Sequence, residues 1–490
     1  MAATVPMAQL TNMKNRNNAV NCIRDKRACH TGYLAGLCLL FSGLSVHAAE
    51  WDNSLGLGVE ASYYDNILYA APGEEVSDKI LILTPALEVH GEGARASLDL
   101  SYRLQSINYA SNNEYDGKYE QYSADSSIEL GEDWLFLDLA SGRTQRAIAA
   151  TGVIPIDNIG ISSNRTNATT YTVSPYISTR FSENSAMLLR YTRDRISYDD
   201  DVPISPISDA RRYDFWLTGA GMLDWRISAS RNEFDVPGVD SGADNYYSDM
   251  GLRLSYDTGS QFTPHFSYGV EDNRIQGSVY ENGGSYWEAG FAWEISSRTT
   301  LSASTGKRFY GKSHAFSLTV AGRYMNINAD YSEDVTSDAQ GYALRNISNL
   351  PPGGSYGGFR PITNDPYINK RMAAGVIFSK SKTSLNLSVY SSKRQFLSSG
   401  DADRNYGSRL AWGWAISSRT TTSFDVNVQR YKSYYSDITN TLMMLGLSAR
   451  HQTTETLATE FGYRQRRQDS GGAAYNYRQN ILFFSLTAEF

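Results

Sequence analysis

Apolar and polar residues alternate one by one along most of this chain. The last such segment, for example, carries its apolar side chains at every second position: Leu482, Phe484, Leu486, Ala488 and Phe490. A period of two places one face of a β-strand on an apolar surface and the other on a polar one. Many alternating segments run for about 8–12 residues, longer than the ~5–6 residues of ordinary soluble strands and close to the ~9–11 needed to cross a bilayer. The alternation therefore predicts an all-β fold, a transmembrane antiparallel β-barrel.

The connections between these segments alternate between short and long. Short polar turns are predicted at 131–133, 182–185, 296–299, 380–383 and 417–420, and long polar segments at 142–168, 198–211, 232–246, 272–284, 332–370, 397–406 and 467–477. Short turns on one side and long loops on the other are typical of outer-membrane barrels. Strand starts are predicted near 53, 79, 94, 119, 134, 169, 186, 212, 222, 247, 261, 285, 300, 314, 324, 371, 384, 407, 421, 440, 456 and 478. This gives about 22 strands, or 18–20 if the hairpin near 314 and 324 and one other are loop decoration.

The first 48 residues have the pattern of an export signal. A basic cluster at 24–27 precedes a short apolar stretch at 32–46, and small residues follow it. This order is typical of a secretory signal peptide, and we place the cleavage after Ala48. The predicted domains are therefore 1–48, an N-terminal extension and signal peptide, and 49–490, the barrel. Because strand-like sequence begins soon after Ala48, we do not expect an N-terminal plug domain.

Composition excludes several other classes. No apolar segment reaches 18 residues, so the chain is not a helical membrane protein. The formal net charge of -7 argues against nucleic acid as a partner. All three cysteines lie before residue 39, so the predicted barrel has no disulfide to stabilise it.

Several short motifs resemble one known family. They are Tyr64–Ile67, Leu83–Leu87, Gly91–Arg95, Asn164–Thr166, Tyr171–Tyr176, Ser297–Thr300, Arg308–Gly311 and Tyr331–Val335. In this order they resemble the outer-membrane β-barrels associated with PEP-CTERM/exosortase systems, which are similar to barrels encoded with exopolysaccharide genes. The resemblance spans roughly 60–490 and its motifs are structural. It implies a location in the outer membrane and a role near polysaccharide export, and it implies no catalytic residue.

Motifs that carry chemistry are missing from the sequence. The mature chain has four histidines, none in an HExxH or His-x-His pattern, and there is no GxSxG elbow or phosphate-binding glycine loop. We therefore predict no catalytic residue, no cofactor and no metal site, and the protein is not expected to be an enzyme. The acidic residues at 199–201, 240, 244 and 249 are interpreted as solvated loop charge, with a weak divalent-cation bridge to lipopolysaccharide as the alternative.

Candidate functional residues follow from the barrel itself. The polar members of alternating strands should face the lumen, and we name Arg95, Asp99, Arg103, Arg190 and Glu288. The longest irregular segment, 332–370, contains Tyr356, Phe359 and Arg360, which are candidates for contact with glycan, either inside the lumen or on the outer surface. The terminal Phe490 is the candidate signal for membrane assembly.

The predicted function is a conduit or accessory for exopolysaccharide export in the outer membrane of a Gram-negative bacterium. The alternatives are a surface adhesin or polymer anchor that uses the long loops, and a rim enzyme built around His265 or His314. The expected partners are outer-membrane lipid and lipopolysaccharide, the outer-membrane assembly machinery, exopolysaccharide and periplasmic export proteins. We expect a monomer.

Overall fold

The computed structural model describes residues 50–149, 152–154, 157–199, 207–234, 245–343, 362–363, 365–434, 439–471 and 475–490, with backbone alone at 341–343. Residues 51–490 form one compact unit. No helix in the described part of the chain has the length and apolar character of a membrane span.

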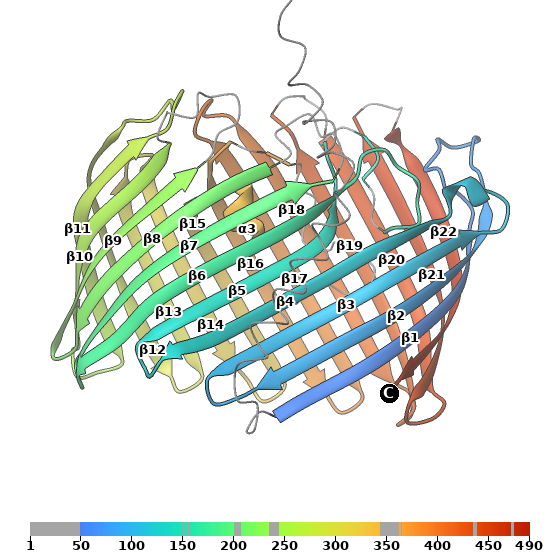
Figure 1. Ribbon diagram of the computed structural model, residues 1–490, viewed down its shortest axis with the longest axis horizontal. Helices are drawn as coiled ribbons and strands as arrows, with labels where there is room; N and C mark the ends of the chain where they lie inside the picture. The colour runs from blue at the N-terminus through green and yellow to red at the C-terminus, as the bar shows by residue number, and fades with distance from the viewer. Residues whose placement is uncertain are drawn as a thin grey trace, which may run out of the picture. The chain divides into compact units, whose positions relative to one another are not determined.

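Twenty-two antiparallel strands make up this unit (Figure 1). They are β1 (Glu50–Tyr64), β2 (Asp78–Glu92), β3 (Ala96–Tyr109), β4 (Gly117–Gly131), β5 (Leu135–Arg146), β6 (Thr166–Ser182), β7 (Ser185–Tyr198), β8 (Ile207–Gly219), β9 (Leu223–Phe234), β10 (Tyr246–Tyr256), β11 (Phe262–Arg274), β12 (Gly283–Ser296), β13 (Thr299–Arg308), β14 (Gly311–Ala321), β15 (Met325–Thr336), β16 (Tyr367–Lys380), β17 (Thr383–Phe396), β18 (Ala402–Ala415), β19 (Thr420–Lys432), β20 (Thr439–Gln452), β21 (Leu457–Ser470) and β22 (Tyr477–Glu489). Within the described residues, two short helices, η1 (Asn113–Tyr115) and α3 (Asp338–Ala343), lie in connections.

The sheet closes on itself. Each strand pairs with the next one in sequence, and β1 pairs with β22 from Gly56 opposite Glu489 to Tyr64 opposite Ile481. Closure leaves no unpaired sheet edge, which is the condition for spanning lipid with strands. The prediction of a 22-strand transmembrane barrel is confirmed, including the hairpin near 314 and 324, which forms β14 and β15.

The alternation in the sequence becomes an apolar outer wall. Leu81 and Leu83 of β2 are 51% and 42% exposed, whereas Ile80 and Ile82 between them are buried on the inner side. Exposed leucine, phenylalanine, valine and methionine side chains recur in the same way on most strands. Because these side chains have no protein neighbour outside the wall, lipid is the environment that covers them.

The two ends of the barrel differ. Each even-numbered strand from β2 to β20 is joined to the next strand by a short turn, as in β2–β3 and β16–β17, whereas β5–β6 and β15–β16 are joined by long segments. Trp51, Trp134, Trp216, Trp225, Trp293, Trp412 and Trp414 all lie within a few residues of the short-turn end, and Trp287 lies toward the other end. In outer-membrane barrels the short turns are periplasmic and the long loops extracellular, so the short-turn end of this barrel is its periplasmic end. Tryptophan therefore marks the periplasmic interface, where its amphipathic ring is favoured.

Candidate functional site: the lumen, its cavity and two clamped segments

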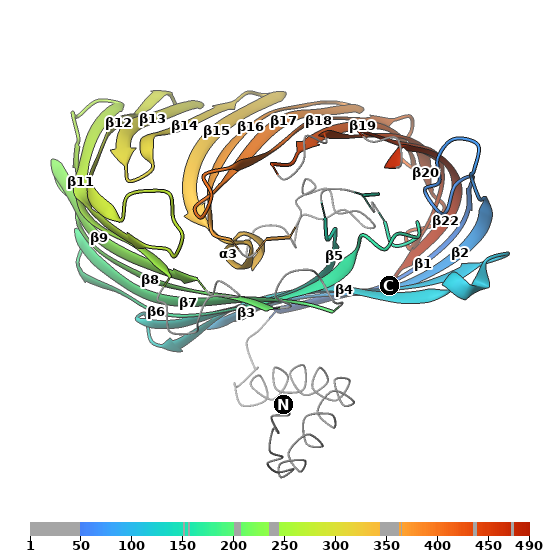
Figure 2. The same cartoon turned by 90° about the horizontal axis from the view of Figure 1, so that it is seen from above.

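Among the described residues, part of the β5–β6 connection and α3 of the β15–β16 connection fold back into the barrel (Figure 2). Seen end-on in Figure 2, α3 and part of the β5–β6 connection lie inside the wall. We call residues 147–165, between β5 and β6, the latch loop; residues 150, 151, 155 and 156 of it are outside the described residues. Its isoleucines pack on the inner wall: Ile154 with Tyr431 and Leu442, and Ile159 among side chains of β1, β2 and β3. Burial of these apolar side chains favours the in-folded position of the loop.

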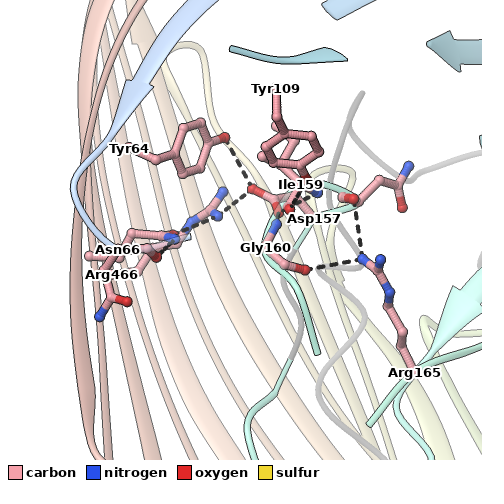
Figure 3. A network of polar contacts seen from close by, with 10 residues as sticks. Tyr64, Asn66, Tyr109, Asp157, Ile159, Gly160, Arg165 and Arg466 are labelled. Atoms are coloured by element: carbon pink, nitrogen blue, oxygen red, sulfur yellow. Dashed lines mark hydrogen bonds and ion pairs between the residues drawn. The ribbon is translucent and has the colours of Figure 1, made fainter. Parts of the chain in front are cut away.

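A buried carboxylate fastens the latch loop to the wall (Figure 3). Asp157 forms an ion pair with Arg466 of β21, and both side chains are only 7% exposed. Tyr64 of β1 donates to the same carboxylate oxygen at 3.4 Å. The backbone N–H groups of Ile159 and Gly160 donate to its other oxygen at 2.9 Å each. Asp157 therefore connects the turn of its own loop to two strands near the point where the barrel closes.

The electrostatics of Asp157 favour its charged form. Burial by itself would raise the pKa of this carboxyl group, but the Arg466 guanidinium and the two backbone donors outweigh burial and hold the pKa below its ordinary value. A buried carboxylate that stays ionised needs this set of partners. Removing Arg466 would leave the charge without its cation.

Further hydrogen bonds hold the rest of the latch loop. Gln468 of β21 accepts from the Ile154 N–H at 3.0 Å and donates to the Gly152 carbonyl at 2.8 Å. Arg165 donates to the carbonyls of Asn158 and Gly160, and to the hydroxyl of Tyr119 at 2.8 Å. Gln468 of the wall and Arg165 of the loop itself thus pair with backbone groups that buried backbone cannot leave unsatisfied.

Close packing also constrains the loop at Gly160. A Cβ atom at this position would lie 2.0 Å from the ring of Tyr69. Such an approach is far inside contact distance, so glycine is required for the loop to lie against the β1–β2 connection.

The second in-folded segment, α3, is clamped between opposite walls. Its first residue, Asp338, lies 3.5 Å from the guanidinium of Arg394 on β17 and accepts from the Tyr367 hydroxyl at 3.0 Å. Arg394 also pairs with Asp403 of β18 at 2.6 Å. From the other side, α3 contacts β5 to β8, and Gln340 donates to Asn232 of β9 at 3.1 Å. The helix therefore bridges the β16–β18 wall and the β5–β9 wall.

A polar cavity of about 800 Å³ lies in the lumen beside α3. Residues of β7–β10, β13 and β15–β18 line it, together with Tyr310 and Gln340. Its charged lining residues are Arg190, Arg212, Arg308, Arg371, Asp194, Asp214, Asp249, Glu333 and Asp334, and its tyrosines are Tyr247, Tyr310, Tyr367 and Tyr390. This volume lies in the range of sites that hold small molecules.

Three of the charged lining residues are neutralised at the edge of the cavity. Arg308 pairs with Glu271 at 2.5 Å, and Glu333 pairs with Lys370 at 3.0 Å. Arg190 lies 3.1 Å from Asp138. The remaining lining charges are two arginines and four carboxylates: Arg212, Arg371, Asp194, Asp214, Asp249 and Asp334.

The residues predicted to face the lumen lie in different settings. Arg190 lines the cavity, and its guanidinium stacks on Tyr176. Glu288 lies 3.6 Å from His265 and 3.9 Å from Arg253. Asp99 of β3 contacts His90 of β2 at 2.5 Å, and Arg103 lies on the same face of β3. Arg95 lies in the β2–β3 turn and pairs with Glu132 of the β4–β5 turn at 2.5 Å, so it is at the periplasmic rim and not on the strand wall.

The remaining predicted site residues are Tyr356, Phe359, Arg360 and Phe490, and the structure tests the role of none of them. Tyr356, Phe359 and Arg360 fall outside the described residues. The backbone of Phe490 exchanges two hydrogen bonds with Leu55, at 2.9 and 3.0 Å, which extends the β22–β1 closure, and its role in assembly stays a prediction. The signal peptide at 1–48 and the expectation that no plug domain precedes the barrel also concern residues outside the described ones.

Histidine and acidic clusters do not form a metal site among the described residues, where no group of three or more potential ligands comes together. Asp199, in the predicted acidic loop, pairs with Arg143, and Asp249 accepts from Ser230 inside the lumen.

The central residues of the site, Asp157, Arg466, Asp338 and Arg394, are absent from the sequence-based predictions. Arg394 and Arg466 are polar members of alternating strands, which is the same signal that singled out Arg190. Their acidic partners lie in loops, where nothing in the sequence separates an in-folded aspartate from a solvated one.

Comparison with known proteins identifies no family, and it finds solved structures of similar barrels with low sequence identity. No family model and no curated protein matches this chain. Among solved structures, the barrel is similar to a ferric enterobactin receptor mutant from Pseudomonas aeruginosa, with 12% identity over 90% of this chain and 81% of that chain and a TM-score of 0.45. It is also similar to the siderophore receptor PirA from Acinetobacter baumannii, with 9% identity, coverage of 90% and 81%, and a TM-score of 0.47. A third is the FrpB iron transporter from Neisseria meningitidis (F3-3 variant), with 12% identity, coverage of 90% and 82%, and a TM-score of 0.45.

The closed sheet and its apolar outer wall identify the chain as a β-barrel of the Gram-negative outer membrane. The prediction of exopolysaccharide export is corrected. Two clamped segments, α3 and the latch loop, lie in the lumen where a polymer would need an open path. The resemblance to the PEP-CTERM-associated family and the predicted partners stay predictions.

Proposed function

We propose that this protein takes up small charged solutes across the outer membrane by binding them in the lumen cavity. The observation that carries the proposal is the cavity of about 800 Å³ between β7–β10 on one side and β13 and β15–β18 on the other, which is lined by charged and tyrosine side chains. A protein surface of one predominant charge, set in low-dielectric walls, raises the local concentration of solutes of the opposite charge.

The lining charges favour a solute that carries a positive group. Asp194, Asp214 and Asp249 lie on β7, β8 and β10, along one wall. Arg371, on β16, faces the same cavity from the other wall and is exposed to it. A zwitterion such as an amino acid would place its ammonium group toward the carboxylates and its carboxylate toward Arg371. A purely anionic solute would meet an excess of like charge.

The clamped segments give the path its selectivity. Gln340 of α3 lines the cavity, so a bound solute contacts the segment that Arg394 holds in place. A solute that fits beside α3 can pass with the barrel intact, whereas a hydrated polymer would require α3 or the latch loop to leave the lumen. The proposal is therefore uptake of small molecules, without catalysis.

Ion selectivity in planar bilayers tests the proposal. The purified barrel should give single-channel conductance with a preference for potassium over chloride, because the cavity lining, apart from its ion pairs, carries four carboxylates and two arginines. Asp214→Asn with Asp249→Asn should lower the potassium-to-chloride permeability ratio several-fold, since both charges line the path.

The matched control is Asp257→Asn, which removes a carboxylate from the β10–β11 turn outside the cavity and should leave the ratio unchanged. Retention of radiolabelled lysine, compared with citrate, by proteoliposomes gives a second measurement. A barrel that never conducts and never admits lysine, or a permeability ratio unaffected by the double substitution, would refute the proposal.

A further inference from the structure

A row of positive charges lies on the outer wall at the extracellular end of β17, β18 and β19. Lys393 is directly opposite Arg404 in the β17–β18 ladder, and Arg404 is directly opposite Lys432 in the β18–β19 ladder. Arg430 lies two residues before Lys432, opposite Tyr406. We call Lys393, Arg404, Arg430 and Lys432 the cationic face.

These side chains point away from the lumen. Arg404 lies between Asp403, which pairs with Arg394 inside, and Asn405, which lines the cavity. Successive side chains of a strand point to opposite faces, so Arg404 points outward. Lys393 follows the cavity-lining Ser392 and precedes the buried Arg394, and it points outward for the same reason.

No carboxylate among the described residues pairs with the cationic face. The neighbouring Lys370, opposite Lys393 on β16, pairs with Glu333 at 3.0 Å, so the row of cations without an ion pair to a described carboxylate begins at Lys393. Like charges directly opposite each other across strands destabilise a sheet. The fold keeps three in a row, an arrangement that an external anion would stabilise.

The same end of the wall on β7–β9 is built differently. There the outward arginines have acidic neighbours: Arg193 pairs with Asp209 at 2.6 Å, Arg231 with Glu233 at 2.9 Å, and Arg211 lies 3.8 Å from Glu233. At the extracellular end, the outward arginines on β7–β9 are thus paired with carboxylates of the protein, whereas the cations on β17–β19 are in no ion pair with a described carboxylate.

The surface below the cationic face is apolar. Tyr406 and Val389 are each 41% exposed, and Leu387 and Met443 are each 43% exposed on the outer wall. A tyrosine at the boundary between an apolar band and a charged rim is typical of a membrane interface. The arrangement suits a ligand with an anionic head above an apolar body.

We propose that the cationic face binds the phosphate groups of lipopolysaccharide in the outer leaflet. Lysine and arginine side chains bind phosphate through charge-assisted hydrogen bonds, and arginine does so in a bidentate manner. The phosphates would lie among Lys393, Arg404 and Lys432, while the acyl chains cover Val389 and Leu387. This site is on the lipid side of the wall and is independent of solute uptake through the lumen.

Binding of purified lipid A to the full-length, detergent-solubilised barrel tests the site. The probes are bis-phosphorylated lipid A and the same lipid after removal of both phosphates, and the readout is the dissociation constant from native mass spectrometry. The triple variant Lys393→Gln, Arg404→Gln, Lys432→Gln should bind bis-phosphorylated lipid A at least about tenfold more weakly, since each phosphate loses charge-assisted contacts. Added salt should weaken binding to the unmodified barrel more than binding to the variant.

A charge-matched control separates a local site from net charge. The variant Arg298→Gln, Lys382→Gln, Arg419→Gln removes three positive charges from short turns at the opposite end of the barrel. It should bind lipid A as the unmodified barrel does, and a gel shift between boiled and unboiled samples checks that every variant is folded.

Three results would overturn the site: equal affinity of the triple variant and the unmodified barrel, equal affinity of the unmodified barrel for lipid A with and without phosphate, or equal loss in the control variant. If the triple variant does not fold, Arg404→Gln alone carries the test, with a several-fold loss expected because it occupies the middle of the row.

Discussion

The ion pair between Arg466 and Asp157 holds the latch loop on the barrel wall. Replacing Arg466 with methionine measures the free energy that this ion pair contributes to keeping the loop closed. The substitution keeps an apolar side chain of similar length but removes the cation beside a carboxylate whose side chain is 7% exposed. Removing one partner of a buried ion pair costs about 3–5 kcal/mol, because the remaining charge is buried without compensation. The open loop avoids this cost, since Asp157 then reaches water.

The free energy of loop opening should therefore fall by about 3–5 kcal/mol, which corresponds to a roughly 150-fold to 4,000-fold larger open population. Hydrogen exchange reads this out at the backbone amides of Ile159 and Gly160, which donate to Asp157 in the closed loop. Their exchange should accelerate by a similar factor in Arg466→Met. The amide of Ala168, in the β5–β6 ladder, should exchange at its original rate, because the barrel itself is unchanged.

The double variant Asp157→Asn, Arg466→Met is the matched control. Replacing both charges leaves no buried ion without a partner, so its loop amides should exchange much more slowly than those of Arg466→Met. If exchange at Ile159 and Gly160 in Arg466→Met stays within about threefold of the original rate, the ion pair does not hold the loop and the reasoning fails.

Three further predictions concern the same in-folded segments. Gly160→Ala should destabilise the closed loop by about 1–3 kcal/mol because its methyl group overlaps the Tyr69 ring, and Tyr69→Ala should restore protection of the loop amides in exchange experiments. Arg394→Met should free α3 from the β17 wall, because in the clamped position Asp338 would remain buried without the Arg394 cation. A larger single-channel conductance would confirm this, and an unchanged conductance would contradict it. The pKa of Asp157 is lower in the closed loop than its ordinary value of 3.8, so the contribution of Asp157 to the stability of the closed loop is complete above pH 3.8 and is lost as the pH falls below it. Acid should therefore open the loop only below about pH 4, and opening already at pH 6 would contradict the assignment.

The sequence by itself determined the barrel. Alternation is a local property, readable within ten residues, and it predicted all 22 strands, because an apolar outer face is required wherever a strand crosses lipid. The predicted starts are least accurate at the extracellular end. Strand β8 begins at Ile207 and not near 212, and β18 begins at Ala402 and not near 407. In the added stretch of β18 polar side chains lie on both faces, such as Asp403 on the inner face and Arg404 on the outer face, so the alternation fades while the backbone ladder continues.

Only the tertiary structure decided what lies in the lumen. Asp157 and Arg466 are 309 residues apart in sequence and meet because the barrel closes between β22 and β1. Asp338 meets Arg394 because α3 turns into the lumen, and the 332–370 segment containing it was predicted only as a long loop with two possible positions. Whether a polar loop folds inward depends on the sum of distant contacts on a curved wall, and no local pattern in the chain encodes that sum.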